Sequence, residues 1–219
     1  MTGLILEGGT FRPIFSSGVM DALLDNGIMF PYCIGVSAGI TDGASYVSRQ
    51  KKRNLEILLT YRHDKRYMGL GNFRTSKSLF GLDFAYDEIP NRLNPFDWDT
   101  FFQYEGKFLI GVTNANTGES EYLDGMKMDR GCTMLRATCA IPLLFPEIKI
   151  NGIPYYDGGL ADPIPVRKAL EDGCGKVLIV LTRPEGYRKE QGRDVRLAAR
   201  MLKKKYPALE GLFLTRHEA

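Results

Sequence analysis

Histidine, cysteine and long apolar runs are all scarce in this chain of 219 residues. It contains only two histidines, His63 and His217, and four cysteines. The cysteines are scattered, with no C-x-x-C pair and no histidine at ligand spacing, which argues against a zinc site. We expect reduced, partly buried thiols in a cytoplasmic protein.

Strong charge and membrane-spanning segments are missing as well. No window approaches the roughly 18 apolar residues of a membrane span. The N-terminus lacks the basic and apolar regions of a secretory signal. A formal net charge of +3 is too weak to indicate nucleic acid as a partner. With 44% hydrophobic residues, the composition is that of a globular protein, and we expect one domain over residues 1–219.

Short apolar runs alternate with segments of helical periodicity along the chain. Strands are predicted at Leu4–Leu6, Tyr32–Val36, Lys107–Thr113 and Glu121–Leu123, in a hairpin that turns at Asn151-Gly152, and, as a buried strand, at Val177–Leu181. Helices are predicted from Ser16 or Ser17 to Leu24, at Ala38–Val47, around Leu55–Leu59, at Met134–Ala140 and Val166–Leu170, and in a tail broken near Pro207. The segment Tyr67–Phe101 has no steady periodicity and is predicted as loop with short helical pieces. The alternation indicates an α/β fold with a largely parallel sheet.

A G-x-S-x-G motif, Gly35-Val36-Ser37-Ala38-Gly39, falls between a predicted strand and a predicted helix. In that context the serine sits on a sharp turn at the positive end of a helix, and the glycines let the backbone bend. Such a serine is a candidate nucleophile. The alternative is a plain helix N-cap, where serine is also favoured.

A serine nucleophile needs a base within hydrogen-bond reach. His63 lies in a charged stretch typical of a solvated helix end, and His217 lies close to the C-terminus, where disorder is common. The order Ser37, Asp157, His217 matches that of the α/β-hydrolases, but that fold places several strands before its nucleophile. Only 36 residues precede Ser37 here.

Asp157 is a third candidate base. It follows an apolar and aromatic run and precedes Gly158 and Gly159, which would let the loop approach another backbone closely. The alternative is an ordinary Asx-turn, since Asp-Gly is common turn chemistry.

Two further glycines, Gly8 and Gly9, follow the first predicted strand after a single residue, Glu7. They can serve a tight turn, because glycine tolerates positive φ. They can also present bare N–H groups that hold negative charge beside a helix N-terminus.

Taken together, the glycine turn, the G-x-S-x-G motif and the late D-G-G resemble the patatin-like phospholipases, most closely their small, single-domain bacterial members. The resemblance covers roughly Leu4 to Thr182 and includes "TCAIPLLFPEIKINGIPYYDGGLADPIPV", with its alanine-proline segment and its proline-rich start to the next helix. It implies a three-layer α/β/α sandwich with a mostly parallel central sheet. It also implies a dyad of Ser37 as nucleophile and Asp157 as proton acceptor, with no catalytic histidine.

The family's first turn reads G-G-G-x-R-G, and its amides form an oxyanion hole. Carried over, this implies that the amides of Gly8, Gly9 and Thr10 hold the oxyanion, with Arg12 as part of the motif. Thr10 stands where the family has a third glycine, and a β-branched residue resists positive φ. Pro13 replaces the last glycine and suits the first turn of a helix.

The resemblance implies a serine acyl hydrolase of lipid carboxylic esters, such as phospholipids, lysophospholipids or acylglycerols, with no metal or organic cofactor. One alternative is a lipid-binding protein whose activity is weakened or lost through Thr10. Another is a protein that binds phosphate or a nucleotide at Gly8-Gly9. The usual phosphate-loop motifs are absent from this turn, which counts against that alternative.

Two basic runs, Lys51–Arg53 and Lys203–Lys205, suggest peripheral contact with an anionic membrane surface. The alternative is an ordinary solvated helix face. Because family members usually continue beyond this point, we also expect the chain to be truncated at its C-terminus.

Overall fold

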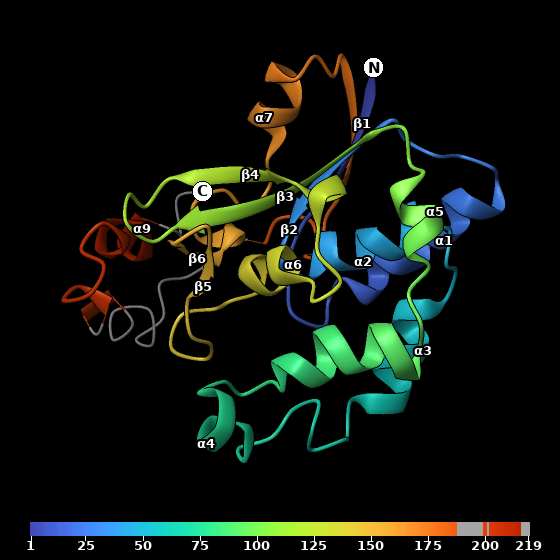
Figure 1. The fold of residues 1–219 in the computed structure, drawn as a ribbon. Helices are drawn as coiled ribbons and strands as arrows, with labels where there is room; N and C mark the ends of the chain where they lie inside the picture. The colour runs from blue at the N-terminus through green and yellow to red at the C-terminus, as the bar shows by residue number, and fades with distance from the viewer. Residues whose placement is uncertain (188–198, 201, 216–219) are drawn as a thin grey trace.

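A computed structural model describes residues 1–187, 199–200 and 202–215 (Figure 1). Its centre is a sheet in which four strands run parallel, in the order β7-β1-β2-β3. Their bounds are β1 (Thr2–Leu6), β2 (Tyr32–Val36), β3 (Lys107–Asn114) and β7 (Lys176–Val180). These four segments were all expected as strands, and the predicted α/β fold with a mostly parallel central sheet is confirmed.

The edge strand β7 differs from its prediction in burial. The apolar run was expected to be a buried strand, yet Leu178 is 37% exposed and Leu181, just past its end, is 48% exposed. β7 pairs with β1 alone among the described strands, so one side of it faces outward. An apolar run by itself does not distinguish a central strand from an edge strand.

Two antiparallel hairpins extend the parallel core beyond β3. β4 (Ser120–Asp124) pairs with β3, and β5 (Ile148–Ile150) pairs with β6 (Ile153–Asp157). The turn between β5 and β6 has positive φ at both central residues, 51° at Asn151 and 83° at Gly152. Asn-Gly suits a turn of this kind, and the hairpin predicted there is confirmed.

Strands β2 and β6 meet end to end along one side of β3. β2 pairs with β3 up to the partners Val36 and Gly111, and β6 begins its pairing at the next position, where Asp157 faces Val112. β4 occupies the opposite side of β3 over the same stretch. Since β2 is parallel and β6 antiparallel to β3, both strands run toward this junction. The residues at their C-terminal ends are therefore neighbours.

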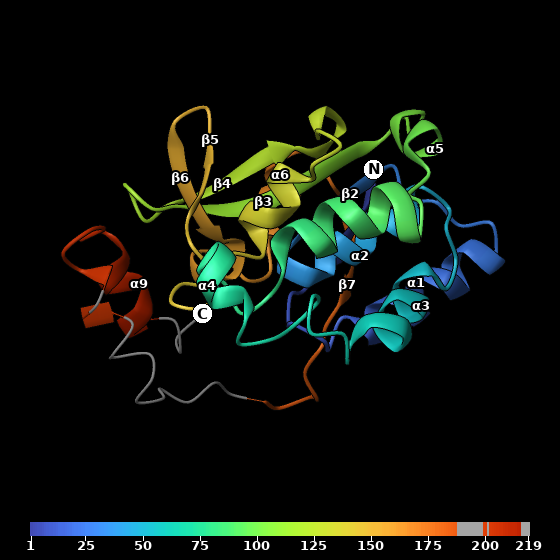
Figure 2. The ribbon, with the colours of Figure 1, turned by 60° about the horizontal axis from the view of Figure 1, so that its bottom comes forward.

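Side chains of the central strands alternate between two cores. Leu4, Leu6 and Cys33 point toward a core shared with α2 (Ser37–Val47), whereas Ile5 and Ile34 point toward one shared with α7 (Val166–Glu171). α1 (Ile14–Asp25), α3 (Arg53–Tyr61) and α6 (Thr133–Thr138) lie on the α2 side (Figure 2). Helices thus cover both faces of the sheet, as the resemblance implied.

The segment 67–101 contains more helix than expected. A ten-residue π-helix, η1 (Phe84–Leu93), lies between the short helices α4 (Asn72–Ser76) and α5 (Trp98–Phe102). η1 includes Pro90 and has only three buried residues. Its wider π-type turn does not produce the 3.6-residue apolar period that marks an α-helix.

The predicted helical tail, residues 196–213, falls partly on residues 196–198 and 201, which lie outside the described part. Within that part, α9 (Leu209–Thr215) follows Pro207, and buried residues around it pack into a core with Tyr156 and Phe145. The four cysteines are buried and unpaired, more deeply than the partial burial we expected. No helix in the described ranges is long and apolar enough to cross a membrane.

Candidate active site

Ser37 is the first residue of α2 and follows β2 without an intervening loop. Its φ is 53°, in the left-handed region that residues other than glycine rarely adopt. A Cβ on Gly39 would lie 2.3 Å from the carbonyl oxygen of Glu7, so only glycine lets α2 approach the end of β1 here. A strained serine at such a strand-to-helix turn is the geometry of a nucleophile elbow.

Asp157 is the last residue of β6, and it lines a cavity that Ser37 also lines. Its Oδ1 accepts a hydrogen bond of 2.8 Å from the amide of Gly159, so the Asx-type turn that the sequence allowed is present. A Cβ on Gly158 would lie 2.2 Å from the carbonyl oxygen of Gly111, which accounts for the glycine after the aspartate. The side chain is 5% exposed and lines a cavity of about 510 Å³ together with Ser37.

Thr138, at the end of α6, ties the serine turn to the sheet. Its hydroxyl accepts a hydrogen bond of 2.8 Å from the amide of Ser37 and donates one of 2.5 Å to the carbonyl of Gly111. Sequence reasoning assigned this residue no role. It lies in the alanine-proline segment that supported the resemblance, but a threonine in a short helix carries no signal of its partner.

The first glycine turn lies against the serine turn. A Cβ on Gly8 would be 2.9 Å from that of Ser37, and Gly8, Gly9 and Thr10 all line the cavity that holds Asp157. Among the described residues, the amides of these three residues donate no hydrogen bond. Three free amides beside a serine are a suitable environment for negative charge.

Thr10 has a φ of 56°, so this position does take the left-handed conformation that a β-branched residue resists. The strain expected from the sequence is therefore present in the backbone of the turn. Neighbouring contacts must hold it in place, because such conformations persist only where the surroundings fix them.

Glu7, Arg12 and Thr182 provide these contacts. The amide of Thr182 donates to the Glu7 carboxylate, and its hydroxyl oxygen lies 2.9 Å from the carbonyl of Gly8. Arg12 Nε donates to the same hydroxyl at 3.4 Å, and its guanidinium occupies the space where a Cβ of Gly9 would be. Burial and the nearby Arg183 lower the pKa of Arg12. Arg12 thus braces the turn by packing against its backbone.

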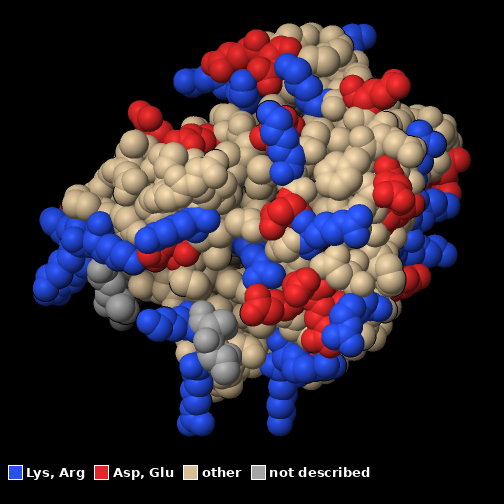
Figure 3. Space-filling model, in the orientation of Figure 1, with Lys and Arg blue, Asp and Glu red and all other residues tan. Residues whose placement is uncertain are grey.

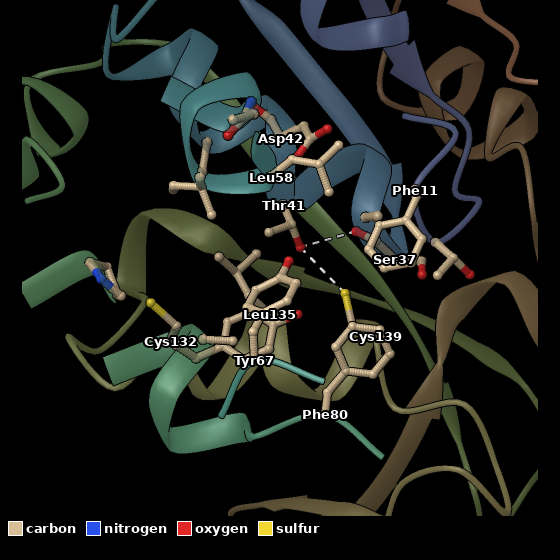
Figure 4. A pocket seen from close by; sticks show the side chains of 18 of the residues that line it. Phe11, Ser37, Thr41, Asp42, Leu58, Tyr67, Phe80, Cys132, Leu135 and Cys139 are labelled. Carbon is tan, nitrogen blue, oxygen red and sulfur yellow. Dashed lines mark hydrogen bonds between the residues drawn. The ribbon is translucent and has the colours of Figure 1, made fainter. Parts of the chain in front are cut away.

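A second cavity, of about 180 Å³ and mostly apolar, adjoins Ser37 on the α2 side (Figure 4). Thr41 Oγ1 donates to the carbonyl of Ser37 at 3.1 Å and lies 3.4 Å from Cys139 Sγ. Burial raises the pKa of Cys139 to about 11, so its thiol stays protonated. Most of the other lining side chains are apolar, among them Phe11, Ile14, Leu58, Phe80, Leu135 and Phe145.

Neither cavity is lined by a histidine in the part of the chain that the structure describes. His63 is exposed just after α3 and lines neither cavity. His217 lies outside the described residues.

Thr10→Gly tests the strained turn. The change relaxes φ and keeps the amide N–H, so we expect kcat to be preserved or raised. The free energy of unfolding should rise by about 1 kcal/mol, because one residue is released from an unfavourable conformation. Ester turnover and denaturant unfolding measure the two quantities. A tenfold loss of kcat would show that the threonine side chain has a role of its own.

Proteins similar to this chain occur in a bacterium, a yeast and a virus. The chain is 25% identical over 186 residues to "Uncharacterized protein YjjU" of Escherichia coli, covering 83% of this chain and 52% of that protein. It is 26% identical over 184 residues to "Lysophospholipase NTE1" of Yarrowia lipolytica, and the match covers 81% of this chain and 12% of that protein. It is 26% identical over 198 residues to "Probable lipid hydrolase 463L" of Invertebrate iridescent virus 6, and the match covers 77% of this chain and 63% of that protein.

The chain spans about half the length of YjjU and about one-eighth of the yeast lysophospholipase. The family model "Patatin-like phospholipase" matches residues 4–170, a stretch that includes the glycine turn, the serine elbow and the D-G-G segment. The chain belongs to the patatin-like phospholipase family.

Proposed function

We propose that this protein is a serine acyl hydrolase that cleaves carboxylic esters of lipids with a Ser37-Asp157 dyad. The observation that carries the proposal is the junction on β3. There, β2 and β6 end at adjacent positions, so that Ser37 and Asp157 line one cavity. The glycine turn adds amides to the same cavity that donate no hydrogen bond within the described part of the chain.

In the proposed reaction, Asp157 accepts the proton of Ser37 Oγ while that oxygen attacks the ester carbonyl carbon. The carbonyl oxygen takes up negative charge and is held by the amides of Gly8, Gly9 and Thr10. The intermediate collapses by expelling the alcohol, which takes the proton from Asp157. Water then gives a proton to Asp157 and attacks the acyl-enzyme. The second intermediate collapses by expelling Ser37 Oγ, which takes the proton back from Asp157, and the carboxylic acid is released.

Two cavities meeting at Ser37 suit the two halves of a lipid ester. The mostly apolar cavity favours an acyl chain, since burying each methylene group contributes about 0.8 kcal/mol. The other cavity also contains Arg12, Arg183 and Glu185 and suits the polar alcohol part. Relatives named as a lysophospholipase and a probable lipid hydrolase support this substrate class.

Turnover of p-nitrophenyl esters and of a panel of phospholipids, lysophospholipids and acylglycerols by the purified protein tests this function. The proposal predicts ester cleavage that a serine-reactive phosphonate blocks. Lipid binding without turnover of any ester would instead support the alternative, a patatin-like lipid-binding protein in which the strain at Thr10 has removed activity.

The two basic runs are poor candidates for a membrane-binding surface. Lys51 pairs with Asp25, Lys203 pairs with Glu210 at 2.9 Å, and Lys205 pairs with Glu147. The runs lie on different sides of the molecule, near α3 and α9 (Figures 1 and 2). On the face of the molecule drawn in Figure 3, acidic side chains are interspersed with basic ones.

A group of exposed apolar side chains on segments next to the apolar cavity, here called the apolar rim, is the better candidate. It comprises five exposed side chains: Phe11, Leu70, Phe73, Leu143 and Leu144. Backbone hydrogen bonds join its segments, from Gly69 to Leu79 and from Leu79 to Leu144, and the Phe11 ring lies 6.0 Å from that of Phe80. We propose that this apolar rim contacts the lipid surface from which a substrate chain enters.

Co-sedimentation with phosphatidylcholine vesicles tests the apolar rim. We expect binding that changes little with salt and falls several-fold in Leu70→Asp, because a charge there would have to enter the lipid. Leu170→Asp, at a 55% exposed leucine on α7, is the matched control and should bind as the wild type does. Binding that requires anionic vesicles and disappears at high salt would favour the basic runs instead.

A further inference from the structure

One wall of the apolar cavity carries polar and charged groups. Asp42 on α2 and Arg53 and Asn54 on α3 line the cavity alongside its apolar side chains. Figure 4 shows Asp42 beside Leu58, on the part of α2 that lies beyond Thr41 when followed from Ser37. The proposed catalytic reaction uses none of these groups.

A hydrogen-bond network fixes the Asp42 carboxyl group in this wall. Ser17 Oγ on α1 donates to Asp42 Oδ2 at 2.9 Å, and Asn54 Nδ2 lies 3.1 Å from both Ser17 Oγ and the carbonyl oxygen of Asp42. Ser45 Oγ in turn donates to Asn54 Oδ1 at 2.7 Å. Three helices therefore hold the carboxyl group in one position.

The network leaves hydrogen-bonding capacity unused. A carboxylate can accept about four hydrogen bonds, and within the described residues Asp42 receives a single side-chain donor, on Oδ2. Arg53 Nε is buried and has no partner in the part of the chain that the structure describes, although Nη2 donates to the carbonyl of Asn94 at 3.0 Å. Burial raises the pKa of Asp42 to about 7, opposed by Ser17 and Arg53. A buried polar atom such as Arg53 Nε is rarely left without a partner in native proteins.

A plain alkyl chain would seal these groups against methylene groups and leave them without partners, which is unfavourable. An ammonium group on the chain would face Arg53 as well as Asp42, and a carboxylate would face Asp42 as well as Arg53, so attraction to one wall charge is opposed by repulsion from the other. A hydroxyl group is neutral and can both donate and accept, so it suits a wall that carries both charges.

We propose that the apolar cavity selects acyl chains that carry a hydroxyl group, which donates a hydrogen bond to Asp42. This specificity rests on the proposed acyl hydrolase function. Asp42 lies five residues beyond Ser37, about 7.5 Å along the helix axis, so the hydroxyl that reaches it lies beyond the first few carbons of the acyl chain. Asp42 is a specificity-determining residue here and takes no part in the proposed bond cleavage.

Separate hydrolysis rates of p-nitrophenyl decanoate and of its monohydroxylated derivatives test the selection. For the wild type we expect kcat/KM to be about tenfold higher or more for a derivative hydroxylated near the middle of the chain. Asp42→Leu, which keeps the branching but is apolar, should favour the plain chain. Asp42→Asn keeps an acceptor oxygen and should retain part of the preference. Asp99→Leu, at an aspartate that does not line the cavity, should behave as the wild type does.

A binding measurement separates this inference from the proposed function. With Ser37→Ala protein, the affinity for free hydroxydecanoate and for decanoate can be compared by displacement of a fluorescent fatty acid. We expect the hydroxylated acid to bind about tenfold more tightly, and Asp42→Leu to abolish the difference. Equal affinities would overturn the hydroxyl selection even if ester turnover is found. A retained preference without any ester turnover would overturn the proposed function alone.

Discussion

Replacing Ser37 by alanine is expected to lower ester hydrolysis by about 10³-fold or more, because no other group would form the acyl-enzyme. The fold should survive the change. Ser37 is nearly buried, but the amide that Thr138 binds remains in the variant, and alanine keeps the same Cβ, so the backbone strain at this position is unchanged. Initial rates with a p-nitrophenyl ester, together with circular dichroism, measure activity and fold separately.

Ser48→Ala is the matched control for this experiment. Ser48 is also a nearly buried serine, located at the other end of α2, where its hydroxyl lies 3.2 Å from the carbonyl of Ser45. It lines neither cavity, so its loss should leave the rate within a few-fold of the wild type. Activity within a few-fold of the wild type in Ser37→Ala would end the assignment of Ser37 as nucleophile.

Asp157→Asn is expected to lower turnover by about 10²- to 10⁴-fold, the range that a positioned general base commonly contributes. Asparagine keeps the shape of the side chain and an oxygen that can accept from the amide of Gly159. It cannot take up the proton of Ser37. The dominant effect should therefore fall on kcat, and little should change in denaturant unfolding.

Three variants serve as controls for the dyad. Asp162→Asn alters a carboxylate five residues along the chain, which accepts from the Tyr122 hydroxyl at 2.5 Å and does not line the cavities. It should retain activity, as should His63→Ala and His217→Ala. A histidine variant as inactive as Asp157→Asn, with its fold intact, would contradict the dyad. The order Ser37, Asp157, His217 would then have to be reconsidered.

Local sequence signals predicted much of the fold and of the candidate site. Asn151-Gly152 specifies its hairpin because both residues tolerate positive φ. Gly39 and Gly158 are set by close backbone approaches that any Cβ would block. Features of this kind depend on the chain within a few residues, so a motif can reveal them.

Other features depend on distant contacts and could not be predicted. Thr138 forms hydrogen bonds with both Ser37 and Gly111, although it is 101 residues from the first and 27 residues from the second in the sequence. Asp42 reads as a polar residue in a helix, and only the packing of α1 and α3 against α2 shows that it lines a cavity. The meeting of β2 and β6 along β3 is a matter of strand register, which no single segment encodes.

Mapping the adduct of a serine-reactive fluorophosphonate by peptide mass spectrometry tests the central claim most directly. The account predicts one stoichiometric adduct on the peptide that contains Ser37. It also predicts that the adduct is absent in Ser37→Ala and forms much more slowly in Asp157→Asn. Loss of esterase activity accompanied by an adduct on another residue, or an adduct that persists in Ser37→Ala, would contradict the assignment of Ser37 as the nucleophile.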